Sequence, residues 1–123
     1  MAYVIEGKKE KELKCVPHTK VLVSGIKVTL DIVKEEDYEE CRRLLNTEIE
    51  RGNTYPQEHQ LDFEGFKNYF LSHYAFSVKC EETFAEIARG QILGCFYVKP
   101  NFPGRSSHIC NGGHLFYFFS LPY

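Results

Sequence analysis

The chain has 123 residues and a mass of 14.3 kDa, the usual size of one domain built around a single core. Hydrophobic residues make up 43% and charged residues 26% of the sequence, a balance typical of globular proteins that excludes disordered, collagenous and membrane-embedded classes. The net charge of −2 and the pI near 6.2 lack the basic excess expected for binding to nucleic acid or anionic membranes.

The amino terminus and the cysteines predict an intracellular setting, cytoplasmic or nuclear. Residues 1–12 lack the apolar core of a secretory signal. No apolar run approaches the roughly 20 residues that span a bilayer. The five cysteines are odd in number and widely scattered, so we expect free thiols.

Residues 1–19 are predicted to form a charged amino-terminal arm, because residues 7–14 mix charges with a single apolar residue. A short apolar stretch, residues 21–23, and a turn at Ser24-Gly25 follow. Over residues 27–33 the alternating side chains and the β-branched content predict a strand.

Residues 34–51 carry apolar side chains at the i, i+3, i+4 spacing of an amphipathic helix, which Gly52 is expected to end. Pro56 prevents the helix from continuing, and Asp62 is suited to cap a second, aromatic helix over residues 63–70. The sequence therefore predicts two helices that flank a polar loop.

Strand patterns return at residues 76–78 and again at residues 91–98, an apolar run suited to a central strand that ends at Pro100. A turn at residues 101–104 precedes a further strand over residues 106–119. Gly112-Gly113 interrupts that strand and indicates a bulge or a close backbone approach. The order predicts an α+β fold with two helices packed on a mainly antiparallel sheet. The side chains expected in its core include Leu44, Phe66, Ile92, Leu93, Phe96 and Val98.

This order and several local sequences resemble the first half of the GNAT superfamily of N-acetyltransferases. Residues 28–37 resemble the opening strand and the start of the first helix of the family. Leu45-Asn46 with residues 50–57, and the run over residues 92–113, resemble a branch of uncharacterised GNAT proteins. We therefore expect residues 20–113 to form a partial GNAT domain.

The resemblance implies transfer of an acetyl group from acetyl-CoA to a primary amine on a small molecule or a protein. In the family, the fourth strand leads into a basic, glycine-rich loop that binds the pyrophosphate at a helix amino terminus. Here an aromatic tail, residues 114–123, stands in place of that loop. We expect a truncated form, such as a shortened isoform or gene model, whose coding region continues differently after Gly113. We expect this chain to be inactive alone and to bind acetyl-CoA weakly.

By the same resemblance, the cofactor would contact the backbone at Asn111, Gly112 and Gly113. A catalytic base acting through water would be His108 or Glu58. The alternative for His108 is an ordinary strand residue bonded to a neighbour, and for Glu58 a solvated loop carboxylate. Both alternatives stay open on the sequence alone.

Thr54, Tyr55 and Gln57 lie where the family's variable loop between its first two helices borders the acceptor amine. They are the predicted substrate-binding residues. A simple helix-ending turn is the alternative interpretation of this segment.

Metal and thiol chemistry are weaker hypotheses. His108, Cys110 and His114, with Cys95 on the preceding strand, are side chains that bind metals, but their spacing matches no zinc module, and we expect no metal. Cys110 near His108 is the candidate for a nucleophilic thiol, against the expectation of a buried structural cysteine.

A competing hypothesis of another class is a non-catalytic remnant or an interaction module that pairs through its last strand. Residues 115–119 are consecutively apolar, and an open apolar strand edge favours pairing with another chain. The missing glycine-rich loop separates this hypothesis from an enzyme, and self-association is its expected consequence.

Overall fold

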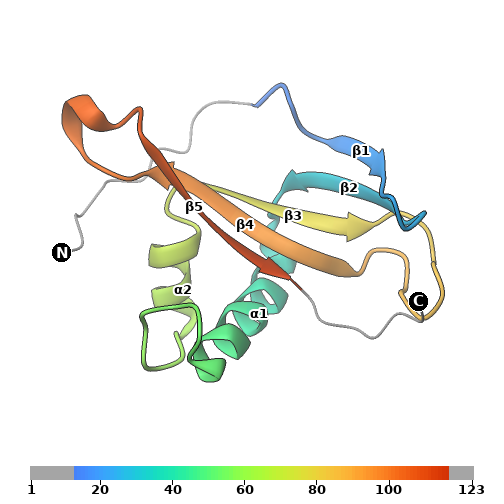
Figure 1. Cartoon of the computed structure of the whole chain (residues 1–123), viewed down its shortest axis with the longest axis horizontal. Coiled ribbons are helices and arrows are strands. Elements are labelled where there is room, and N and C mark those ends of the chain that lie inside the picture. Colours follow the sequence, from blue (N-terminus) through green and yellow to red (C-terminus); the bar gives the residue numbers. More distant parts are fainter. Residues whose placement is uncertain (1–12, 117–123) are drawn as a thin grey trace.

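The computed structural model describes residues 13–116. Its sheet has five strands in the order β1-β2-β3-β4-β5, and every neighbouring pair is antiparallel. Both helices lie on one side of this sheet (Figure 1). The predicted α+β class, with two helices on an antiparallel sheet, is confirmed. The elements in chain order are β1 (His18–Val21), β2 (Lys27–Ile32), η1 (Glu35–Asp37), α1 (Tyr38–Arg51), α2 (Phe63–Phe70), β3 (Tyr74–Cys80), β4 (Ile92–Pro100), η2 (Gly104–Ser106) and β5 (Cys110–Phe116).

The sheet begins earlier in the chain than expected, since β1 starts at His18, inside the segment assigned to a charged arm. The expected turn at Ser24-Gly25 joins β1 to β2, and Gly25 has the positive φ of 91° that favours glycine. The hydroxyls of Thr19 and Thr29 lie 3.0 Å apart across the two strands. Cross-strand pairing of this kind overrides the polar composition that suggested an arm.

Helix α1 begins at Tyr38, because Lys34 is extended and residues 35–37 form a 3₁₀ turn. It ends as predicted at Gly52, which has a left-handed φ of 71°. The N–H of Gly52 donates a hydrogen bond to the carbonyl of Ile49. Cys41, Leu45 and Ile49 recur every fourth residue, and all three are buried against the sheet.

Helix α2 begins at the predicted cap: the Asp62 carboxylate accepts a 2.7 Å hydrogen bond from the N–H of Gly65. Phe66 and Phe70 are fully buried and stack with ring centroids 5.4 Å apart. These rings join the α1 residues in one core between the helices and the sheet.

The core prediction holds for Ile92 and Phe66, which are buried. Leu44 and Leu93 are half-buried and pack against core clusters. Phe96 and Val98 are also only half-buried. Alternation along β4 sends Cys95 and Tyr97 to the helix side, so Phe96 and Val98 project to the opposite face, which α1 and α2 do not cover.

Strand β5 begins later than predicted, at Cys110. Its pairing with β4 runs without interruption through Gly112 and Gly113, so of the two alternatives expected at these glycines the bulge does not form. The register shift in the sheet lies instead between Val78 and Lys79 of β3. The strand starts at Cys110 because residues 104–109 form turns that connect it to β4. Residues 117–119 of the predicted strand lie outside the described residues.

Candidate functional site

Gly113 of β5 lies directly against the side chain of Tyr97 on β4. The register places Gly113 opposite Tyr97 and Asn111 opposite Lys99. A Cβ atom at position 113 would lie 2.6 Å from Cε1 and 2.8 Å from Oη of Tyr97. Glycine is therefore required here by space, since the Tyr97 ring packs directly on the β5 backbone. The close approach expected from paired glycines is confirmed at Gly113.

Three tyrosines and one lysine gather around this contact, and we call them the tyrosine–lysine cluster: Tyr55, Tyr69, Tyr97 and Lys99. Tyr55 comes from the loop between α1 and α2, Tyr69 from α2, and the other two from β4. The hydroxyls of Tyr69 and Tyr97 lie 3.1 Å apart, and the Tyr55 ring meets the edge of Tyr69 at 6.3 Å. Three separate elements thus converge at the end of β4 nearest α2.

Lys99 is held inside the cluster by two kinds of contact. Its Nζ lies 4.4 Å from the ring centroid of Tyr69 and 4.8 Å from that of Tyr97. The same atom donates a 3.3 Å hydrogen bond to the carbonyl of Tyr69. Burial lowers the pKa of Lys99, because the surrounding rings replace water around the ammonium group. The lysine therefore releases its proton more readily than an exposed one.

The pKa values of two phenols in the cluster, Tyr55 and Tyr97, are shifted in the opposite direction. Burial raises the pKa of Tyr55 to about 12, with a smaller electrostatic contribution from the neighbouring Tyr69. Burial and the hydrogen bond to Tyr69 also raise the pKa of Tyr97. At neutral pH Tyr55 and Tyr97 therefore remain protonated donors beside a lysine of weakened basicity. Such a set of groups is suited to binding a polar reactant and to relaying protons.

The predicted substrate loop contributes one side chain to this cluster, Tyr55. Thr54 is exposed and donates a 3.3 Å hydrogen bond to Glu48. Gln57 is half-buried, and its Oε1 atom is buried without a hydrogen-bond partner among the described residues. A buried acceptor without a donor fits a ligand that supplies an N–H group.

The structure does not bring the two predicted base residues together. His108 is exposed in the connection between β4 and β5, where its Nδ1 lies 3.1 Å from the carbonyl oxygen of Arg105. Glu58 is exposed in the loop between α1 and α2. In Figure 1 the β4–β5 connection extends beyond the end of β4, whereas the α1–α2 loop lies beside the helices, away from the sheet. Neither residue is a member of the tyrosine–lysine cluster.

The sequence interpretation missed Tyr69, Tyr97 and Lys99. Tyr97 is a core residue that was not among the predicted ones, with 5% of its surface exposed. The available signal was the spacing of Tyr97 and Lys99, two residues apart on one strand, which places them on the same face. The contact with α2 is tertiary and leaves no local pattern.

The metal and thiol hypotheses find no support in residues 13–116. Cys110 and His114 share a face of β5, but His108 lies outside the strand, and the described part of the chain holds no cluster of three metal-binding side chains. The His114 ring stacks on Phe96 at 5.4 Å. Cys110 is exposed, so the expectation that it is buried is wrong.

Cys95 is a buried thiol on β4, the strand that carries Tyr97. Its pKa is raised by a hydrogen bond to Cys41 and by burial. Because the thiolate is the reactive form, this cysteine is suited to packing and not to nucleophilic attack.

Two hollows lie away from the cluster. An apolar groove of about 270 Å³ lies over Val78, Leu93, Phe96, His114 and Phe116. A second, polar hollow of about 440 Å³ lies beside the start of α1. Its acidic groups already have ionic partners: Lys79 pairs with Asp37 at 2.8 Å, and Arg43 pairs with Glu40 at 2.9 Å.

The residues predicted to contact acetyl-CoA lie on β5, which forms one edge of the sheet among the described residues. Asn111 and Gly112 are exposed there, and Gly113 is half-buried beneath Tyr97. A strand edge presents N–H and C=O groups, which suit the amides of a pantetheine arm. After Arg105 the sequence holds no lysine or arginine that would pair with phosphate.

No helix among residues 13–116 is long and apolar enough to cross a membrane. No protein-family model matches the chain. The chain is 40% identical over 92 residues to the N-acetyltransferase aca1 of Schizosaccharomyces pombe, a match that covers 67% of this chain and 44% of that protein. Its fold is similar to that of a GCN5-related N-acetyltransferase from Kribbella flavida, with a TM-score of 0.62 and 15% identity.

That structural match covers 73% of this chain and 52% of the bacterial protein. The chain thus spans about half the length of the two proteins it resembles. The sequence match and the structural match are both to N-acetyltransferases. By sequence the chain is related to an N-acetyltransferase, and by fold it corresponds to part of a GNAT domain.

Proposed function

We propose that this chain forms the acceptor-binding part of an N-acetyltransferase that moves acetyl from acetyl-CoA to an amine. The main support is the register that sets Tyr97 and Lys99 opposite Gly113 and Asn111, with Tyr55 of the acceptor loop packed on the same cluster. One compact region thus combines the predicted cofactor strand with the predicted substrate loop. The relation to N-acetyltransferases favours this reaction over other uses of such a site.

The proposed roles follow from the chemistry of each group. The Oε1 atom of Gln57 accepts a hydrogen bond from an N–H group of the incoming amine. That amine must lose a proton before it attacks the thioester. The phenol of Tyr97 donates toward the reacting groups next to Gly113. Acetyl-CoA supplies the activated acetyl group when it is bound. His108 and Glu58 stay predictions as bases acting through water.

A chimera tests this proposal. The 92 matched residues of the S. pombe relative are replaced by those of this chain, and acetyl transfer to a panel of amines is followed by mass spectrometry. We expect transfer to be retained and to fall in the chimera carrying Tyr97→Phe. A folded chimera that binds acetyl-CoA but transfers no acetyl group would contradict the proposal.

The second candidate function is association with another copy of the chain through β5. Strand β5 carries neither a charged residue nor a proline, whereas β1, at the other edge of the sheet, contains Lys20 and follows Pro17. Charged residues and prolines are common protections of strand edges. The Phe116 side chain is 67% exposed beside the apolar groove. Light scattering after size-exclusion chromatography tests this candidate: a concentration-dependent dimer would support it, and a persistent 14.3 kDa monomer would reject it.

An intracellular location is also part of the proposal. Its support is that all five cysteines are free thiols, three of them buried. Fractionation of cells that express a tagged chain would place the protein, and recovery from the medium would contradict this assignment.

A further inference from the structure

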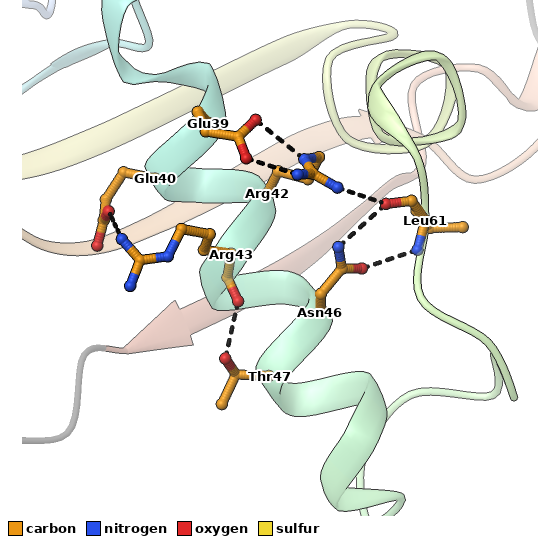
Figure 2. Close-up of polar contacts among 7 residues, drawn as sticks. All are labelled: Glu39, Glu40, Arg42, Arg43, Asn46, Thr47 and Leu61. Carbon is orange, nitrogen blue, oxygen red and sulfur yellow. Dashed lines mark hydrogen bonds and ion pairs between the residues drawn. The ribbon is translucent and has the colours of Figure 1, made fainter.

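The side chain of Asn46 binds both backbone groups of Leu61, the last residue before the cap of α2. Its Oδ1 atom accepts a 2.8 Å hydrogen bond from the N–H of Leu61, and its Nδ2 atom donates a 3.0 Å bond to the Leu61 carbonyl. Figure 2 shows both bonds leaving the same amide group. The amide thus pairs with Leu61 as a neighbouring strand would.

Arg42, one turn earlier on α1, adds a third bond to the same residue. Its Nη1 atom donates to the Leu61 carbonyl at 3.2 Å (Figure 2). Glu39 fixes the direction of the guanidinium through bonds of 3.0 and 2.5 Å, and this pairing raises the pKa of Arg42. We call Asn46 and Arg42, with the backbone of Leu61, the Asn46 clamp.

The clamp lies at one end of the loop that runs from Gly52 to Leu61. Helix α1 closes the other end at Gly52. Tyr55 lies between these two ends, and its ring reaches the edge of Tyr69. Asn46 is 6% exposed, so its amide is removed from water and depends on Leu61 for its bonds.

We propose that Asn46 and Arg42 are positioning residues of the acceptor site, which hold the loop so that Tyr55 packs against Tyr69 and Gln57 is directed inward. The recognition of an amine by this loop rests on the proposed function. The effect of the clamp on the position of the loop does not depend on that function, so an experiment can reject either one without rejecting the other. A purely structural role in seating α2 is the competing explanation, because Leu61 precedes the Asp62 cap.

The ionisation of Tyr55 reports the position of the loop. With its pKa at about 12, Tyr55 is about 3% ionised at pH 10.5, whereas an exposed tyrosine with a pKa of about 10 is about three-quarters ionised. NMR of the 123-residue chain with ¹³C labels at the tyrosine Cζ atoms measures the ionised fraction of each tyrosine. The Tyr55 signal is assigned by its loss in Tyr55→Phe.

The test compares Asn46→Ala and Arg42→Met with two controls. Glu39→Gln removes the charge that supports Arg42 but leaves the bonds to Leu61, and Asp62→Ala removes the α2 cap but leaves the clamp. We expect the ionised fraction of Tyr55 at pH 10.5 to rise more than tenfold in Asn46→Ala and severalfold in Arg42→Met. Both controls are expected to stay near the wild-type value.

Two results would overturn the inference. One is a folded Asn46→Ala variant in which Tyr55 keeps its wild-type ionisation. The other is an equal rise in Asp62→Ala, which would show that the bonds serve to seat α2. Should Asn46→Ala fail to fold, Arg42→Met decides alone, because Arg42 is only partly buried and its loss leaves the core intact.

Discussion

Replacing Gly113 by alanine tests the packing on which the candidate site depends. The φ of Gly113 is outside the left-handed region, so alanine introduces no backbone strain there, and the cost is steric. The new Cβ would lie 2.6–2.8 Å from three atoms of the Tyr97 phenol group, so the side chain must move. Overpacking of this kind costs about 1–3 kcal/mol. Alanine also restricts the unfolded chain, which returns about 0.4–1 kcal/mol.

The net expected loss is therefore between about 0 and 2.6 kcal/mol, with a central value near 1.3 kcal/mol. For a chain of this size each kcal/mol lowers the Tm by roughly 3–6 °C. Urea denaturation measures the free energy of unfolding. Gly112→Ala is the matched control, since its Cβ would lie 3.1 Å from the Tyr97 carbonyl oxygen and 3.8 Å from Cε1 of His114. For this control we expect a loss below about 1 kcal/mol. In a Tyr97→Leu background the cost of Gly113→Ala should largely disappear. An equal cost in both backgrounds would refute the reasoning, because the ring would not be the obstacle.

Three further predictions concern other parts of the structure. Asp62→Ala removes the carboxylate that caps α2 and should lower the free energy of unfolding by about 0.5–2 kcal/mol in urea titrations; an unchanged value would show that the cap contributes nothing. The folded-state pKa of Tyr55 is raised above its unfolded value, so the stability linked to its neutral form is present below about pH 10 and is lost as the pH rises toward about 12. Tyr55→Phe should therefore flatten the alkaline fall in Tm, and an equally steep fall would contradict this. A thiol reagent should modify the exposed Cys15 and Cys110 in the native protein and spare the buried cysteines until unfolding, whereas rapid reaction of Cys95 would contradict its burial.

The elements that were predicted correctly are those whose signals are local. Gly52 and Asp62 end and begin helices through their own backbone freedom and side-chain chemistry, and both do so as expected. The apolar run of β4 also identified a strand, but it did not say that α1 and α2 cover one face only. Phe96 was therefore placed in the core, although it projects to the face opposite the helices.

The candidate site was harder to predict because its contacts join distant parts of the chain. Gly113 was singled out as a place of close approach, yet only the register of β4 and β5 identifies the Tyr97 ring as the group that approaches. The position of Lys99 between two rings depends on where α2 packs, which no spacing in the sequence records. Asn46 was noted for its resemblance to a family, and its bonds to Leu61, fifteen residues away, are tertiary.

The most direct test of the central claim, that this chain carries one side of an acetyl-transfer site, is an NMR titration of the ¹⁵N-labelled chain with acetyl-CoA. We predict shifts at the amides of Asn111, Gly112 and Gly113 on β5 and of Tyr97 opposite them, with an affinity weaker than that of an intact acetyltransferase. A nucleotide that carries the phosphates of the cofactor without its pantetheine arm should leave these amides unchanged, because the strand edge is expected to bind the arm. Shifts confined to the apolar groove on the opposite face, or none at millimolar acetyl-CoA, would contradict the claim.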